Sequence, residues 1–111
     1  MTTLDNFLKL IGGPRDGALL RFSIGNEYLK ADDPKGAVEH LREAVTRDPN
    51  YSAAWKLLGK ALAAAGDNPA ALDAYRQGIT AAEARGDVQA AKEMTVFARR
   101  VEKAITPPAT S

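Results

Sequence analysis

Few residues of this chain have the types and spacing that chemistry needs. The only histidine, His40, has Glu39 and Glu43 as neighbours, but the chain has no cysteine and no second histidine. A metal site or a nucleophile relay would need further ligands or a nucleophile of that kind. We predict that His40 lies on the exposed side of a helix, where solvation explains it better than catalysis does.

Two other patterns resemble reactive sites only in part. Asp32 and Asp33 are adjacent carboxylates, but Asp33 precedes Pro34 and is explained by helix capping, and neighbours at a turn seldom converge on one substrate. The two glycines at 12–13 are followed by no lysine-serine or lysine-threonine pair, which a phosphate-binding loop would have. We therefore predict that the protein is not an enzyme and uses no cofactor and no metal.

The basic side chains allow more than one interpretation. Lys56 and Lys60 are one helical turn apart and could bind a carboxylate of a partner, although two solvated lysines would look the same. The cluster of Arg99, Arg100 and Lys103 suits the negative end of a helix dipole. With 15 basic and 14 acidic residues, the net charge of +1 gives no field that would attract nucleic acid or an anionic bilayer. We expect neither as a partner.

Helices must position these side chains, because apolar residues recur at helical spacing along most of the chain. Asp33 is expected to cap a helix that ends before Asp48, since Pro49 follows. We predict that Asn50 caps the next helix and that Gly66 ends it. Two more helices follow, beginning after the aspartates at 67 and 87, and the glycine at 86 separates them.

The helical pattern repeats after 34 residues, which is typical of a stacked supersecondary unit. The recurring positions of the first unit are Ile24, Gly25, Tyr28, Ala37 and Leu41, and those of the second are Leu58, Gly59, Leu62, Ala71 and Tyr75. The glycines and alanines are small where two helices come close, and the larger residues fill the space between them.

These positions resemble the tetratricopeptide repeat, whose pattern is Trp-x2-Leu-Gly-x2-Tyr, then Ala-x3-Phe, then Pro. The second unit matches from Trp55 to Tyr75, while the first has Arg21 at the tryptophan position and keeps Pro49. The second unit has Glu83 at its closing proline position, so its second helix is expected to run on. The resemblance covers about residues 18–85. It implies an all-α fold of antiparallel helical hairpins stacked as a short right-handed solenoid.

The expected organisation is one repeat domain with short additions at each end. Its parts are an N-terminal amphipathic segment at 1–13, a domain at 14–106 with units at about 18–51 and 52–85 and a capping helix at about 87–105, and a disordered tail at 107–111. The N-terminal segment would either cap the stack or cover its groove. The chain lacks a signal-like start and a long apolar run, so we expect a cytoplasmic protein with no membrane partner.

The resemblance also implies a function, because the first helices of successive tetratricopeptide hairpins line a concave groove that holds a peptide or a helix of a partner. The expected groove residues are Phe22, Asn26, Leu29, Lys30, Lys56 and Lys60, with Ala63 and Ala64. Of the residues with which chaperone-binding members clamp a carboxylate, only Asn26 is present, so we expect no such clamp. The alternative is a structural or self-associating subunit. We expect a monomer or a weak homo-oligomer with an unidentified protein or peptide partner.

Overall fold

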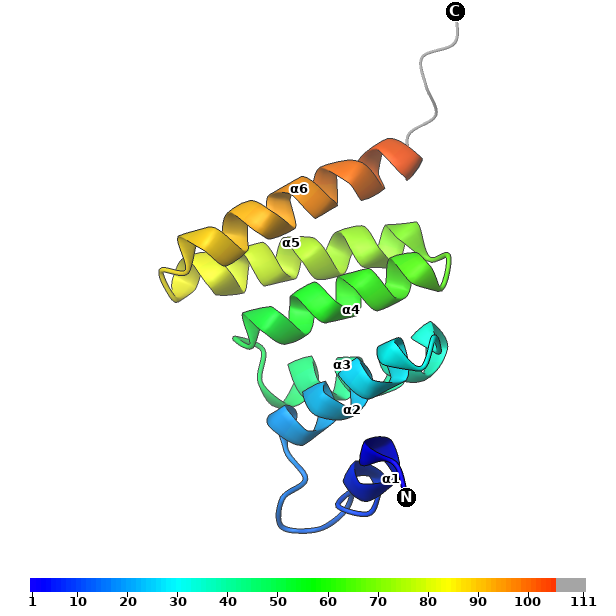
Figure 1. The fold of residues 1–111 in the computed structure, drawn as a ribbon. Helices are drawn as coiled ribbons and strands as arrows, with labels where there is room; N and C mark the ends of the chain where they lie inside the picture. Colours follow the sequence, from blue (N-terminus) through cyan, green and yellow to red (C-terminus); the bar gives the residue numbers. More distant parts are fainter. Residues whose placement is uncertain (106–111) are drawn as a thin grey trace, which may run out of the picture.

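The structure is a computed structural model that describes residues 1–105, and within this range it consists of six helices and no strand. The helices are α1 (Thr3–Leu8), α2 (Ala18–Lys30), α3 (Pro34–Arg47), α4 (Ser52–Ala64), α5 (Asn68–Ala84) and α6 (Val88–Ile105). Figure 1 shows them stacked in chain order, with α1 at one end and α6 at the other. The all-α prediction is confirmed. The tail predicted at 107–111 lies outside the described residues.

Consecutive antiparallel helices pack into hairpins, α2 with α3 and α4 with α5, and α6 packs against α5. The core follows the stack from the first hairpin to the last helix. Its largest fully buried side chains are Ile24, Leu41, Leu58 and Met94. Each hairpin therefore buries its apolar stripe partly within itself and partly against the next layer, as repeat architectures do.

Aspartate caps begin three of the helices as the sequence predicts. The carboxylate of Asp33 accepts from the backbone N–H of Gly36 at 3.0 Å, and Asp67 does the same one unit later with Ala70 at 3.2 Å. Asp87 starts α6 with a similar bond of 3.1 Å to the third residue after it. These bonds satisfy backbone donors that have no partner inside the helix.

The predicted cap at Asn50 is wrong. Helix α4 begins at Ser52, and Tyr51 precedes it without a capping side-chain bond. The reason is local, because the backbone N–H of Asn50 donates to the carboxylate of Asp48 at 3.1 Å. Asn50 therefore belongs to the turn that Asp48 organises and lies one residue too early to cap the helix.

Left-handed residues end the helices. Gly66 follows α4 with φ of +88° and Gly86 follows α5 with φ of +72°, as predicted for these glycines. The equivalent position after α2 is Asp32, the only non-glycine residue among 1–105 with positive φ, at 60°. Helix α5 has 17 residues against 14 for α3, in line with the missing proline at Glu83.

Two glycines allow the helices of each hairpin to approach closely. A Cβ atom placed on Gly25 would lie 2.5 Å from Cγ of Leu41, and one on Gly59 would lie 2.5 Å from Cε1 of Tyr75. Both separations are far inside van der Waals contact. The register that the two units share thus reflects a fit between a glycine on the first helix and a large side chain on the second.

Candidate functional site

The predicted groove residues surround two adjoining hollows on the face formed by the first helices of the units. The Phe22 hollow, of about 310 Å³, is lined by Phe22, Asn26, Ala53, Lys56, Leu57, Lys60, Tyr75 and Phe97. The Leu29 hollow, also about 310 Å³, is lined by Asn26, Leu29, Lys30, Asp32, Pro34, Leu57, Lys60 and Ala64. The hollows share Asn26, Leu57 and Lys60. Together they make one continuous surface, which we call the groove.

The two predicted lysines of α4 differ in their surroundings. Lys56 forms a 3.4 Å ion pair with Glu93 of α6, and its ammonium lies 5.9 Å from the ring centre of Phe97. Lys60 is exposed and has no ion pair with any residue among 1–105. At the α2 end of the groove, Lys30 pairs with Glu27 at 3.1 Å. Lys60 is therefore the groove cation whose charge is not already balanced by a described neighbour.

Aromatic side chains give the groove its apolar walls. Phe22 contacts Tyr51 with ring centres 5.1 Å apart, and Tyr75 contacts Phe97 at 5.7 Å. Such tilted pairs hold rings in fixed orientations. Burial raises the pKa of the Tyr75 phenol, so this ring stays neutral at physiological pH. The groove thus combines apolar surface, the amide of Asn26 and positive charge, which suits recognition of a polypeptide.

Tyr75 and Phe97 also line the groove, although the predicted groove set contains neither of them. A signal for Phe97 was present, since it lies 34 residues after Ala63 and 68 after Leu29, in the same register. The last helix lacks the repeat motif at its tryptophan, leucine and glycine positions, so the motif itself does not predict this role for Phe97. Position within the stack, rather than motif, brings α6 to the groove.

Helix α1 packs against α2 at the first end of the stack, as Figure 1 shows. Its Leu4, Phe7 and Leu8 are partly buried there, while neither hollow of the groove has a lining residue from 1–13. A separate shallow hollow lies where residues 2–4 meet Glu27 and Ala31. In this arrangement α1 leaves the groove open, and a stabilising role for the 1–13 segment stays a prediction.

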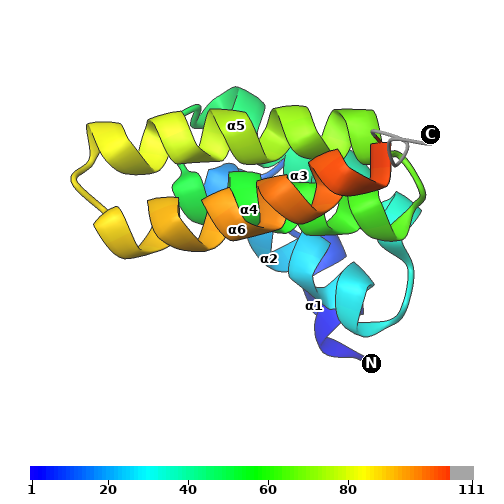
Figure 2. The same cartoon turned by 90° about the horizontal axis from the view of Figure 1, so that it is seen from above.

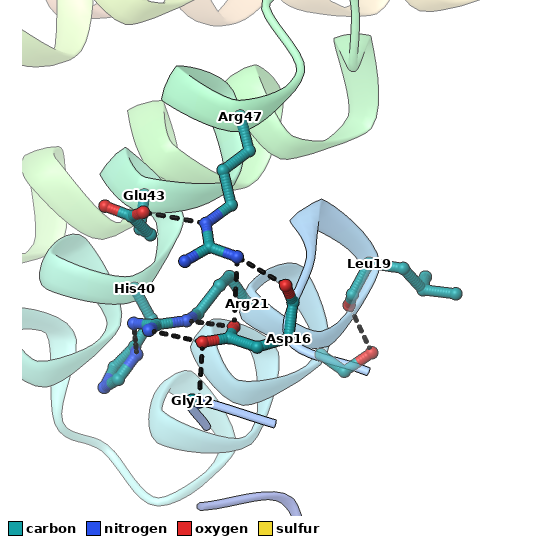
Figure 3. A network of polar contacts seen from close by, with 8 residues as sticks. Gly12, Asp16, Leu19, Arg21, His40, Glu43 and Arg47 are labelled. Atoms are coloured by element: carbon teal, nitrogen blue, oxygen red, sulfur yellow. Dashed lines mark hydrogen bonds and ion pairs between the residues drawn. The ribbon is translucent and has the colours of Figure 1, made fainter. Parts of the chain in front are cut away.

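His40 is buried, so its predicted exposure is wrong. Only 8% of its surface is accessible, and its ring stacks on Tyr28 with centres 5.4 Å apart. Its Nδ1 lies 3.3 Å from Nη1 of Arg21, within hydrogen-bond distance (Figure 3). The buried face of α3 is wider than its alanine and leucine stripe, because it also meets the polar side chains of α2.

Arg21 also anchors the segment that precedes α2. Its Nε and Nη2 donate to the two carboxylate oxygens of Asp16 at 2.9 and 3.1 Å, and the N–H of Gly12 donates to the same carboxylate at 2.9 Å (Figure 3). Arg47 of α3 lies 3.4 Å from this carboxylate and also pairs with Glu43 at 2.8 Å. The hydrogen bonds from Arg21 hold the pKa of Asp16 far below its usual range. Two helices are thereby tied to one carboxylate.

This environment predicts a pH-dependent stability. Burial, and then the charge of Arg21, lower the pKa of His40, against smaller opposing effects of Glu39 and Asp16. His40 therefore binds a proton more readily in the unfolded chain than in the folded protein. Its contribution to the free energy of unfolding is complete above the pKa that His40 has in the unfolded chain, and it is lost as the pH falls. We expect the melting temperature to decrease on acidification from about pH 7.5 to about pH 5.5, the range in which an unfolded histidine titrates.

The matched control is His40→Gln, which does not titrate and keeps a polar side chain near Arg21. Its melting temperature should change much less across the same pH range. Differential scanning calorimetry of the two proteins measures both slopes. Equal slopes would show that His40 is not the group responsible.

The structure defines a class of protein, the helical-hairpin repeats, and comparison with known proteins gives the family. The tetratricopeptide repeat family matches residues 22–88. A tetratricopeptide repeat-containing protein of Pseudomonas aeruginosa, PA0015, is 50% identical over 103 residues, covering 93% of this chain and 98% of that protein. The chain belongs to the tetratricopeptide repeat family.

Solved structures agree with this assignment. The solution structure of BPP2914 from Bordetella parapertussis is 39% identical with a TM-score of 0.78, covering 95% of this chain and 93% of that one. The tetratricopeptide domain of Sgt2 from Aspergillus fumigatus is 28% identical with a TM-score of 0.76, covering 97% and 74%. The fold is that of a protein–protein interaction module, and family members are typically non-catalytic scaffolds.

Among residues 1–105, every helix falls short of the length and apolar character that a membrane-spanning helix needs. The same residues contain no group of three or more histidine, cysteine, aspartate or glutamate side chains placed to hold a metal ion.

Proposed function

We propose that this protein binds a peptide segment or a helix of a partner protein in the groove. The observation that carries the proposal is the continuity of the two hollows, which join apolar walls to Lys60, a cation that no residue among 1–105 pairs with. An apolar side chain of the partner would enter the Phe22 hollow between Phe22 and Phe97. A carboxylate of the partner would then bind Lys60, which lines both hollows.

The difference between the two lysines makes this proposal specific. Lys56 is already paired with Glu93, so a partner carboxylate that bound it would have to compete with an internal ion pair. Lys60 offers its charge without that competition. We expect the groove to prefer segments in which an aspartate or glutamate stands near an aromatic or branched apolar residue, because such segments match both features.

Selection of random peptides displayed on phage against the immobilised protein tests this preference. For enriched peptides, Lys60→Glu should weaken binding about fivefold or more, in keeping with the loss of an ion pair and its replacement by like charge. Fluorescence anisotropy with the corresponding labelled peptides gives the dissociation constants. Lys56→Glu should have the smaller effect, because its charge is partly engaged by Glu93.

Arg42→Glu is a matched control, since Arg42 is exposed on α3 and lines neither hollow. It makes the same change in net charge as Lys60→Glu. If the two reversals lowered the affinity equally, overall charge would explain the effect and Lys60 would not belong to the site. Enrichment of peptides without acidic residues would contradict the proposed preference.

A further inference from the structure

The last layer of the stack has an outer face that no other described helix covers. Helices α5 and α6 lie side by side there, as the view onto this end of the molecule shows (Figure 2). Between them is a hollow of about 630 Å³, which we call the end hollow. Its principal lining residues are Ile79 and Glu83 of α5 and Val88, Lys92, Val96 and Arg99 of α6.

The 34-residue register indicates that this face corresponds to one that another helix covers in the preceding layer. The positions 34 residues before Val88 and Val96 are Ala54 and Leu62, which are 0% and 3% exposed in the layer where α4 packs against α5. In the end hollow, Val88 is 62% exposed and Val96 is 45% exposed. The apolar positions of a covered layer are thus repeated at the end of the stack, with their side chains in contact with solvent.

The charges beside these valines are unbalanced. Lys92 and Arg99 are seven residues apart on α6, about 10 Å along the helix axis, and neither forms an ion pair with a residue of the described chain. Among the residues that the structure describes, Glu83 is the only acidic one lining the hollow. A partner that covers the valines therefore binds most tightly if it also places carboxylates beside Lys92 and Arg99.

We propose that the end hollow binds an amphipathic helix of a partner protein through its apolar stripe and through acidic side chains that meet Lys92 and Arg99. A second copy of this chain fits less well. Two-fold pairing of α6 about a point between Thr95 and Val96 would place Lys92 of one copy opposite Arg99 of the other, and like charges would meet at both ends. The site is separate from the groove, because the two share no lining residue.

A synthetic amphipathic helix is a direct probe. It carries a leucine stripe at helical spacing and two glutamates seven residues apart at the edge of the stripe, and a matched peptide carries lysines in place of the glutamates. We expect the glutamate peptide to bind the wild type about tenfold more tightly than the lysine peptide, since two partly exposed ion pairs are involved. Fluorescence anisotropy measures both affinities.

Charge reversal on the protein supplies the second half of the test. Lys92→Glu with Arg99→Glu should weaken binding of the glutamate peptide about tenfold and strengthen binding of the lysine peptide. Both residues are exposed, so helicity should persist, which circular dichroism checks. The groove reversal Lys56→Glu with Lys60→Glu should leave both affinities unchanged, so failure of this proposal is distinguishable from failure of the groove proposal.

Two results would overturn the assignment. If reversal at Lys92 and Arg99 left the preference for glutamate intact, or if the groove reversal abolished it, the peptide would bind elsewhere. If sedimentation showed that the wild type dimerises and that Val96→Asp makes it monomeric, the face would be an interface between copies of this chain.

Discussion

We expect Gly59→Val to lower the free energy of unfolding by about 3 kcal/mol, the upper part of the usual range for inserting atoms into a packed core. The first atom added would lie 2.5 Å from Cε1 of Tyr75 and 2.7 Å from its Cδ1. Tyr75 has little room to move, because only 5% of its surface is exposed and its ring packs on Phe97. The hairpin of α4 and α5 must therefore separate to accept the new side chain.

Urea unfolding followed by circular dichroism measures this change, with Ala64→Val as the matched control. Ala64 is an exposed residue of the same helix, so its replacement introduces the same branched side chain without a contact in the core. We expect its effect to stay within about 0.5–1 kcal/mol, the cost of lower helix propensity. Similar midpoints for the two variants would mean that the close approach at Gly59 is not what limits the packing.

The glycine positions also show how much of the fold could be predicted from sequence. Gly25 and Gly59 were predicted to lie where helices approach, and Asp33 and Asp67 were predicted as caps, because these roles depend on a residue and its immediate neighbours. Local rules of this kind, repeated at a fixed period, gave the helices and their pairing correctly. They failed at Asn50, where a competing side chain two residues away organises the turn.

The environment of His40 could not be predicted in the same way. Its burial depends on Tyr28 and Arg21, which lie on another helix. The apolar pattern of α3 alone does not predict that a polar residue of this helix is buried. The groove was only partly predictable for a related reason. Its α2 and α4 residues follow from the register, but Phe97 enters because the last helix continues the stack after its sequence has left the motif.

Arg21 is the position at which motif and structure disagree most. It stands where the second unit has Trp55, and both side chains tie their helix to the preceding segment. Trp55 does so through its Nε1–H, which donates to the carbonyl of Pro49 at 2.8 Å, while Arg21 binds the carboxylate of Asp16. Tryptophan is the family's preferred residue here, so a consensus argument predicts that Arg21→Trp stabilises the protein.

We expect the opposite result, a melting temperature several degrees below that of the wild type. The substitution removes both hydrogen bonds from Arg21 to Asp16, whose side chain is only 7% exposed. The carboxylate of Asp16 then interacts only with the N–H of Gly12 and with Arg47. A poorly solvated carboxylate that loses its main partner destabilises the folded state. His40 would also lose the polar neighbour of its Nδ1.

Neutralising the carboxylate separates this explanation from a simple misfit of the larger ring. Asp16→Asn should destabilise the wild type, because it weakens the bonds to Arg21, but should restore part of the stability lost in Arg21→Trp. The two substitutions are then strongly non-additive, as expected for residues in direct contact. Thermal unfolding of the four proteins gives the coupling. An Arg21→Trp protein more stable than the wild type would show that the motif outweighs the local charge network.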